Sequence, residues 1–211
     1  MAGVTRVYDI KTIDSGTEWW KKVPPAEVNC FPWDSGGYRP QTRAWLGLEK
    51  GALRLRMESY ETERRAEEQG FSALVYTDSC MEFFLSPDPE HTTEYLNWEF
   101  NPAGAIHLAL GKDRRERLHI PVENYRDYFD LAVEAADSFW AVSYRIPLEF
   151  LKRHFPSMDI QAGCTMRGNF YKCGDKTARP HFGCWSPIEL PSPEFHCPAF
   201  FGLLRWPGLL R

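Results

Sequence analysis

The chain has 211 residues, of which 43% are hydrophobic and 26% are charged, and its formal net charge is −4. This length suits one well-buried domain. The slightly acidic charge gives no support for nucleic-acid binding, which depends on a basic surface. No apolar run is long enough for a membrane-spanning helix, and the N-terminal residues lack the apolar segment of a signal peptide. We therefore expect a single cytoplasmic domain over residues 1–211 that binds neither nucleic acid nor membrane.

The sequence contains 16 prolines and 15 glycines, which indicates many turns between short elements and favours β-structure. An edge strand and a loop are expected in residues 1–28. The further predicted strands cover residues 41–48, 52–60, 74–85 with a bend at 78–79, 95–101, 105–110, 131–135, 139–146, 169–172 and 200–204.

Alternation of apolar and charged residues is clearest in the strand predicted over residues 52–60. Leu53, Leu55 and Met57 fall on one face, and Arg54 and Arg56 fall on the other. This pattern is typical of a half-buried strand in an antiparallel sheet.

One helix is predicted, over residues 147–155. Pro147 suits its first turn, and Leu148, Leu151 and Phe155 form an apolar stripe. The segments 61–70 and 112–117 are expected to be a charged loop and a charged hairpin tip.

Many short strands separated by turns, with this one short helix, predict an all-β fold. The expected architecture is an antiparallel β-sandwich of jelly-roll or immunoglobulin-like type. No internal repeat, low-complexity segment or linker divides the sequence, so one domain is the economical interpretation.

Six cysteines are present, and none belongs to a Cys-x-x-Cys pair. Four of them lie in the last third of the chain near His181 and His196, but their spacing matches no common zinc motif. We therefore expect buried free thiols, few disulfides and no bound cofactor.

Polar residues of three predicted strands are expected to meet on one sheet face. Side chains alternate across a strand, so Glu99 and Asn101 share a face, and Glu82 and Asn169 fall at matching positions of their own strands. If these strands are neighbours, the four side chains form a polar patch.

Aromatic residues would border this patch, notably Tyr76, Trp185 and Phe195. Such a surface suits a sugar, because rings cover the C–H faces of a pyranose and carboxylates or amides hydrogen-bond its hydroxyls. The alternative is that the polar residues are the solvated face of an ordinary exposed sheet.

The segment 168–185 adds more candidate ligand-binding groups. Alternation places Tyr171 on the same face as Asn169, whereas Lys172 and Arg179 belong to the strand end and the following loop. There they either close over a ligand or lock the loop by ion pairing, for example between Lys172 and Asp175. Trp185 fits the site and core packing equally well.

Residues 78–84 read Asp-Ser-Cys-Met-Glu-Phe-Phe, which resembles the Asp-Ser-Val-Glu-(aliphatic or aromatic)-Phe signature of family 9 carbohydrate-binding modules. Residues 95–101, the Ile-Pro-Leu step at 146–148, the Gly-Asn-Phe-Tyr strand at 168–171 and the ending His-Cys-Pro-Ala-Phe-Phe-Gly at 196–202 fall in the matching order. The resemblance covers about residues 40–204. It is strongest to stand-alone family 9-like proteins, in which a Gly-Asn-Phe-Tyr-Lys-Cys-Gly-Asp run is typical.

The resemblance implies a site in which two aromatic residues enclose a terminal sugar. Glu82 matches the signature Glu, and Asn101 matches a strand Asn of the family. Glu99 stands where the family carries Arg, and Asn169 stands where it carries Gln. The first aromatic residue of the family is either replaced by Tyr76 or absent.

The second aromatic residue lines up near Phe195. Some family members also bind structural calcium, for which this sequence has no compact Asp-rich loop. The ligand-binding residues predicted from pattern and resemblance together are Tyr76, Glu82, Glu99, Asn101, Asn169, Tyr171, Lys172, Arg179, Trp185 and Phe195.

The sequence thus predicts a non-catalytic domain that binds a mono- or oligosaccharide and serves carbohydrate metabolism. One alternative is a glycoside-acting hydrolase that uses Glu82 and Glu99 as paired carboxylates, or Asp175 and His181 as an acid–base pair.

The other alternative is a metal- or haem-associated sandwich domain. Its ligands would come from residues such as His107, His119, His181 or His196. Isolated histidines in loops more often make ordinary hydrogen bonds.

Overall fold

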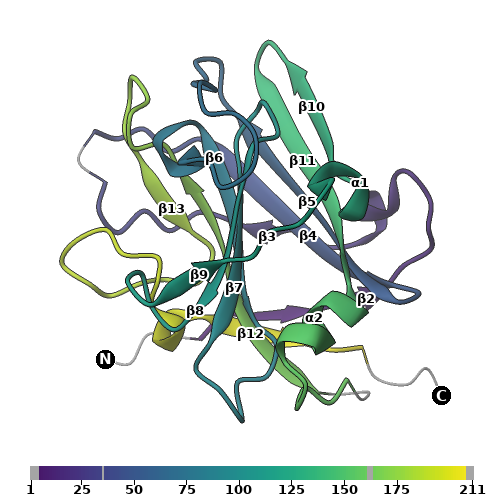
Figure 1. The fold of residues 1–211 in the computed structure, drawn as a ribbon. Helices are drawn as coiled ribbons and strands as arrows, with labels where there is room; N and C mark the ends of the chain where they lie inside the picture. Colours follow the sequence, from purple (N-terminus) through teal and green to yellow (C-terminus); the bar gives the residue numbers. More distant parts are fainter. Residues whose placement is uncertain (1–4, 35, 161–163, 208–211) are drawn as a thin grey trace.

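The computed structural model describes residues 5–34, 36–160 and 164–207. In these residues two β-sheets pack face to face as a sandwich, with the larger sheet at the left of Figure 1 and the smaller sheet at the right. The predicted all-β sandwich is therefore confirmed. Neither α-helix in the described ranges has the length and hydrophobicity needed to cross a bilayer.

The larger sheet has eight strands within the described residues. Its order is β1 (Val7–Asp9), β14 (Gly202–Arg205), β12 (Thr165–Cys173), β6 (Cys80–Ser86), β7 (Tyr95–Phe100), β8 (Ile106–Gly111) and β9 (Arg117–His119). β13 (Phe182–Cys184) pairs with the C-terminal part of β12. All of these pairs are antiparallel except β1 with β14.

The smaller sheet has six strands in the same described ranges. Its order is β10 (Ala132–Ala136), β11 (Phe139–Pro147), β5 (Ala52–Tyr60), β4 (Gln41–Glu49) and β2 (Lys11–Thr12), with β3 (Ala26–Glu27) also paired to β4. The pair of β2 with β4 is parallel. The edge strand expected in residues 1–28 is thus present as two short parallel edge strands, one in each sheet, and the parallel pairing was not predicted.

The predicted helix corresponds to α2 (Leu148–His154), which covers the lower end of the sandwich in Figure 1. A second helix, α1 (Tyr125–Tyr128), is a single turn and too short to show an apolar period in the sequence. The described residues also contain short 3₁₀ segments, at Trp19–Lys22, Val75–Thr77 and Pro198–Phe200.

The main core lies between the two sheets. The predicted alternation of β5 holds, because Leu55 and Met57 point into this core. The rings of Phe83 and Trp98 stack at 6.2 Å from adjacent strands of the larger sheet. Phe150 of α2 packs against Trp98 at 6.1 Å, so the helix closes the end of the same core.

The outer face of the larger sheet is buried as well. Phe84, Tyr95 and Tyr171 on this face are fully buried, and they form a second apolar cluster with Phe195 and Phe201 of the segment that follows β13. A sandwich sheet usually exposes its outer face to water. Here loops cover that face, and they enclose the cavity described below.

A buried ion pair joins β12 to the start of the loop after β5. Lys172 Nζ lies 3.2 Å from Glu61 Oε1, and both side chains are fully buried. Trp140 Nε1 donates a hydrogen bond of 2.6 Å to the same carboxylate. Burial alone would raise the pKa of Glu61, but the charge of Lys172 and the bond from Trp140 hold it below its usual value.

His181 completes this group. Its Nε2 lies 2.8 Å from Lys172 Nζ, and its Nδ1 lies 2.8 Å from Arg179 O. Burial and then the charge of Lys172 lower the pKa of His181 to about 4. The neutral imidazole therefore accepts from the ammonium group and donates to the carbonyl. Lys172 thus pairs with Glu61, and not with Asp175.

We expect Lys172→Met to destabilise the fold by about 3–5 kcal/mol, because it leaves the Glu61 carboxylate buried without its cation. Urea unfolding followed by tryptophan fluorescence measures this change. The matched control is Lys176→Met, which replaces an exposed lysine four residues away and should change the free energy of unfolding by less than about 0.5 kcal/mol. Equal stability of the two variants would contradict a structural role for the Lys172–Glu61 pair.

Candidate functional site

The strand register brings four polar or aromatic side chains into one row on the outer face of the larger sheet. Tyr171 of β12 is opposite Glu82 of β6, Glu82 is opposite Glu99 of β7, and Glu99 is opposite His107 of β8. Directly opposite residues in antiparallel strands have Cβ atoms about 4.5–5.5 Å apart. Two carboxyl groups therefore lie side by side on this face, as the alternation of the predicted strands indicates.

Above this row lies an open cavity with a volume of about 410 Å³. Glu82, Glu99, His107 and Cys173 of the sheet form its floor. The turn between β8 and β9 contributes Arg114, and β9 itself contributes Arg117 and His119. The remaining walls come from the segments 74–76, 175–182 and 193–196, which contribute Leu74, Tyr76, Asp175, Phe182, Pro193, Glu194, Phe195 and His196.

The two floor carboxyl groups are almost completely buried, each residue being 3% exposed. Glu82 Oε1 accepts a hydrogen bond of 2.9 Å from Cys173 Sγ. Glu99 Oε1 accepts one of 2.8 Å from Asn97 Nδ2 and lies 3.7 Å from Arg117 Nη1. Each carboxyl group thus keeps part of its hydrogen-bonding capacity free toward the cavity.

Burial shifts the protonation of both groups. It raises the pKa of Glu99 to about 7, against the opposing charge of Arg117 and the hydrogen bond from Asn97. Burial and then the neighbouring charge of Glu99 raise the pKa of Glu82 well above its usual value. Both groups therefore favour the protonated form more than an exposed glutamate does, and a protonated carboxyl group both donates and accepts hydrogen bonds.

Arg117 is held in place by a chain of polar contacts. Its Nη1 lies 3.1 Å from His196 Nε2, and His196 Nδ1 lies 2.8 Å from the hydroxyl of Tyr95. Burial and then the charge of Arg117 lower the pKa of His196 to about 2. The neutral ring accepts from Arg117 and donates to Tyr95, which fixes the guanidinium beside Glu99.

Aromatic rings supply the apolar part of the cavity. Phe195 stacks on Tyr171 with ring centres 4.2 Å apart, and the Tyr171 hydroxyl donates to Phe195 O at 3.1 Å. Tyr171 therefore positions Phe195 and does not itself line the cavity. Tyr76 is half-buried at the cavity wall and has no ring partner among the described residues.

Four of the ten predicted ligand-binding residues line this cavity. They are Tyr76, Glu82, Glu99 and Phe195.

Three more lie near the cavity on the same sheet and stabilise the structure around it. Tyr171 supports Phe195, as described above. Asn101 bonds Asp78 Oδ2 at 2.8 Å and accepts from the backbone of the turn that follows it. Asn169 makes two hydrogen bonds to the backbone of Ser186, at 2.8 and 2.9 Å.

The remaining three predicted residues lie elsewhere. Lys172 points to the opposite side of the sheet, because neighbours along a strand alternate, and it pairs with Glu61. Arg179 packs over the ring of Tyr38 at 3.9 Å, outside the cavity. Trp185 packs in the main core beside Phe170.

The prediction missed the basic side of the cavity. Residues 112–117 were expected to be a charged hairpin tip, so the strand β9 was not predicted and Arg117 was not a candidate. His119 was named only as a candidate metal or haem ligand. The alternation of the predicted strand 105–110 does place His107 on the correct face. His196 stands in the family-like ending of the chain, but no spacing signal links it to the sheet.

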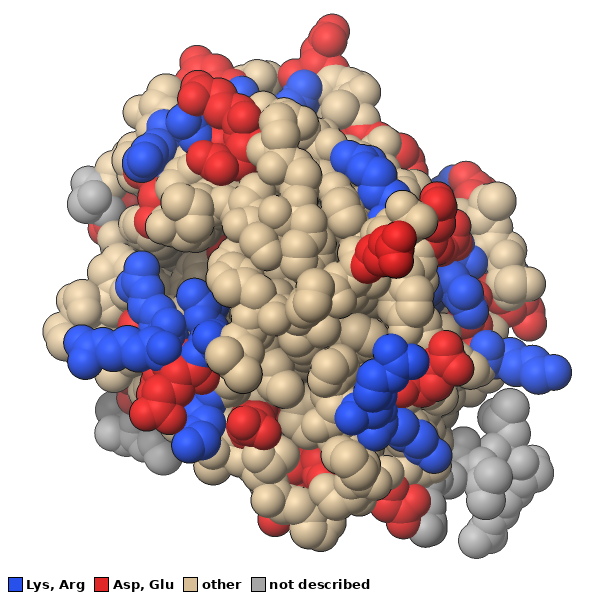
Figure 2. Space-filling view, in the orientation of Figure 1, with Lys and Arg blue, Asp and Glu red and all other residues tan. Residues whose placement is uncertain are grey.

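The surface charge of the molecule is mixed. On the face shown in Figure 2, lysine and arginine residues lie beside aspartate and glutamate residues around an uncharged centre. The cavity lining also contains both signs of charge. Arg114 and Arg117 line it together with acidic residues, namely Glu82, Glu99, Asp175 and Glu194. This arrangement suits a neutral polar ligand better than a polyanion.

Comparison with known proteins finds a matching family model and similar solved structures. Residues 19–206 match the family model described as "Carbohydrate-binding family 9". A "putative carbohydrate-binding protein" from Bacteroides uniformis ATCC 8492 has a similar structure, with a TM-score of 0.77 and 27% identity. The match covers 96% of this chain and 99% of that one. A search of curated proteins found no significant match.

Two further similar structures are of a family 9 carbohydrate-binding module from Caldicellulosiruptor kristjanssonii. One is a complex with cellotriose, with a TM-score of 0.66, 14% identity and coverage of 96% of this chain and 94% of that one. The other is a complex with glucose, with a TM-score of 0.66, 15% identity and coverage of 96% of both chains. At this identity the likeness shows the shared fold.

Proposed function

Because the chain belongs to carbohydrate-binding family 9, we propose that it binds a mono- or oligosaccharide in the cavity on the outer face of its larger sheet, without cleaving it. The observation that carries this proposal is the pairing of two buried carboxyl groups on the floor with aromatic rings in the walls.

The chemistry of the cavity matches that of a pyranose. A sugar hydroxyl both donates and accepts, and a carboxyl group that keeps its proton, which burial favours at Glu82 and Glu99, offers both functions. Asn97 and Arg117 already contact Glu99, so its carboxyl group is fixed before a ligand arrives. The ring of Tyr76 is free to cover the C–H face of a sugar.

The size of the cavity supports the same ligand class. Its volume of about 410 Å³ lies within the range of about 300–1,000 Å³ typical of small-ligand sites. Cellotriose and glucose are the ligands of two structures with the same fold, which makes glucose and short β-glucans the first ligands to test.

The position of the carboxyl groups favours binding over hydrolysis. A glycosidase places its two carboxyl groups on either side of the scissile bond. Glu82 and Glu99 instead lie side by side on the cavity floor, because they occupy directly opposite positions of adjacent strands. Two groups on one side of a sugar hydrogen-bond its hydroxyls but do not flank a glycosidic bond.

We expect wild-type protein to bind glucose, cellobiose or cellotriose at up to millimolar concentration in isothermal titration calorimetry. Tyr76→Ala removes the free ring, and Glu99→Gln removes the ionisable acceptor. Each should weaken binding about tenfold, since hydrogen bonds to charged groups contribute about 1.5–3 kcal/mol and aromatic contacts contribute a similar amount. Arg179→Gln is the matched control, because Arg179 lies outside the cavity, and it should bind like wild type.

A folded wild-type protein that gives no heat and no tryptophan fluorescence change with any of these sugars at millimolar concentration would overturn the proposed function. Equal weakening by Arg179→Gln would show that the sugar binds elsewhere.

Hydrolysis is tested separately on aryl glycosides with wild type and Glu82→Gln. We expect both proteins to release aryl alcohol at the rate of a buffer blank, because Glu82 and Glu99 lie side by side on the cavity floor. Release by wild type that Glu82→Gln abolishes would instead identify a glycosidase.

A further inference from the structure

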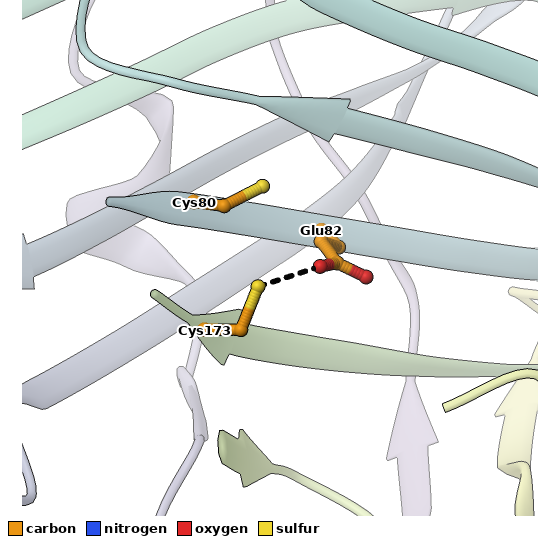
Figure 3. Close-up of side chains that lie close together, drawn as sticks. All are labelled: Cys80, Glu82 and Cys173. Atoms are coloured by element: carbon orange, nitrogen blue, oxygen red, sulfur yellow. Dashed lines mark hydrogen bonds between the residues drawn. The ribbon is translucent and has the colours of Figure 1, made fainter. Parts of the chain in front are cut away.

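Two buried thiols beside Glu82, those of Cys80 and Cys173, are not explained by sugar binding. Cys80 and Glu82 both come from β6, and Cys173 comes from the neighbouring strand β12 (Figure 3). Cys80 and Cys173 are directly opposite each other in the strand register. All three residues are at most 3% exposed.

The ligand-type atoms of these residues converge. The two Sγ atoms and one carboxylate oxygen of Glu82 all lie within 4.8 Å of one another. Ligands of a tetrahedral zinc ion lie about 3.5–3.8 Å apart, given Zn–S bonds of about 2.3 Å and Zn–O bonds of about 2.0–2.2 Å. An ion therefore fits between the three side chains with only small rotations of their χ angles.

We propose that Cys80, Glu82 and Cys173 bind a thiophilic divalent metal ion, such as Zn²⁺, at the floor of the cavity. Two thiolates and one carboxylate are a ligand set that such ions favour. Binding releases the proton of each thiol, and any proton of Glu82, to the solvent.

The surroundings of the three side chains support this site. Glu82 and Cys173 line the cavity, which gives an ion a path to the ligands and leaves a fourth position open to water. A divalent ion with three anionic ligands carries a net charge of −1. The guanidinium groups of Arg114 and Arg117 line the same cavity and offset this charge.

Sequence spacing does not reveal this site. Zinc motifs are recognised from cysteines that are separated by two to four intervening residues. Cys173 instead meets Cys80 through the pairing of two strands that are distant in the chain. A second thiol pair, Cys30 and Cys184, joins two other segments. No Asp, Glu or His completes a ligand group there among the described residues, so this pair is a matched control.

The test uses full-length protein treated with EDTA and a phosphine reductant, and cobalt(II) chloride is the probe. We expect one cobalt ion per chain, with thiolate-to-cobalt charge-transfer bands that Zn²⁺ abolishes. Cys80→Ser/Cys173→Ser should remove these bands, and Glu82→Gln should weaken binding about tenfold or more. Cys30→Ser/Cys184→Ser should retain both the bands and the affinity. Circular dichroism identifies any variant that fails to fold.

Three results would overturn the proposal. The first is a folded, reduced wild type, with all six thiols titratable, that gives no charge-transfer bands. The second is bands that persist in Cys80→Ser/Cys173→Ser. The third is bands that are lost only in Cys30→Ser/Cys184→Ser. The test contains no sugar, so a protein that binds sugar in EDTA but gives no cobalt bands contradicts this proposal alone.

Discussion

The register between β6 and its two neighbouring strands determines which side chains lie at the floor of the cavity. Pairing of β6 with β7 and β12 sets Glu82 opposite Glu99 and Cys80 opposite Cys173. A slip of β6 by one residue would turn Cys80 and Glu82 toward the main core. The register is specified by that core, because Phe83 between these positions stacks on Trp98 and Phe170.

Burial of both faces of the larger sheet gives the site its chemistry. The segment after β13 and the loop before β6 cover the outer face, so Glu82 and Glu99 lie in a low-dielectric environment. A buried carboxyl group tends to keep its proton unless a cation or a hydrogen bond compensates for the lost water. Arg117 and Asn97 oppose this effect at Glu99, whereas Glu82 accepts its hydrogen bond from the weaker donor Cys173. Two identical side chains on adjacent strands therefore differ in how strongly their charged form is stabilised.

Sequence patterns predicted the sandwich and its central strands because alternation is a local property. The faces of β5, the position of α2 and the common face of Glu82 and Glu99 all followed from it. Patterns did not predict partners that depend on how loops fold back. Lys172 carried the same signal as a ligand-binding residue, yet it meets Glu61, which lies at the start of a distant loop.

Sequence composition did not predict the basic side of the cavity, which depends on a few side chains from distant segments. In the sequence, the segment between β8 and β9 has the pattern of a solvated charged tip. In the structure, Arg117 at the start of β9 lines the cavity, and its guanidinium contacts His196. The family resemblance indicated Glu82 and the region of Phe195, which stand next to recognisable runs and line the cavity. It assigned ligand contacts to Asn101 and Asn169, whose amides stabilise a turn and a neighbouring segment.

We propose that the ligand lies on the outer face of the larger sheet, over Glu82 and Glu99. A crystal structure of the protein soaked with cellotriose tests this position most directly. We expect a glucose ring in the cavity, with its hydroxyls on the two carboxyl groups and one C–H face on Tyr76. An ordered sugar elsewhere on the protein, with this cavity empty, would contradict it.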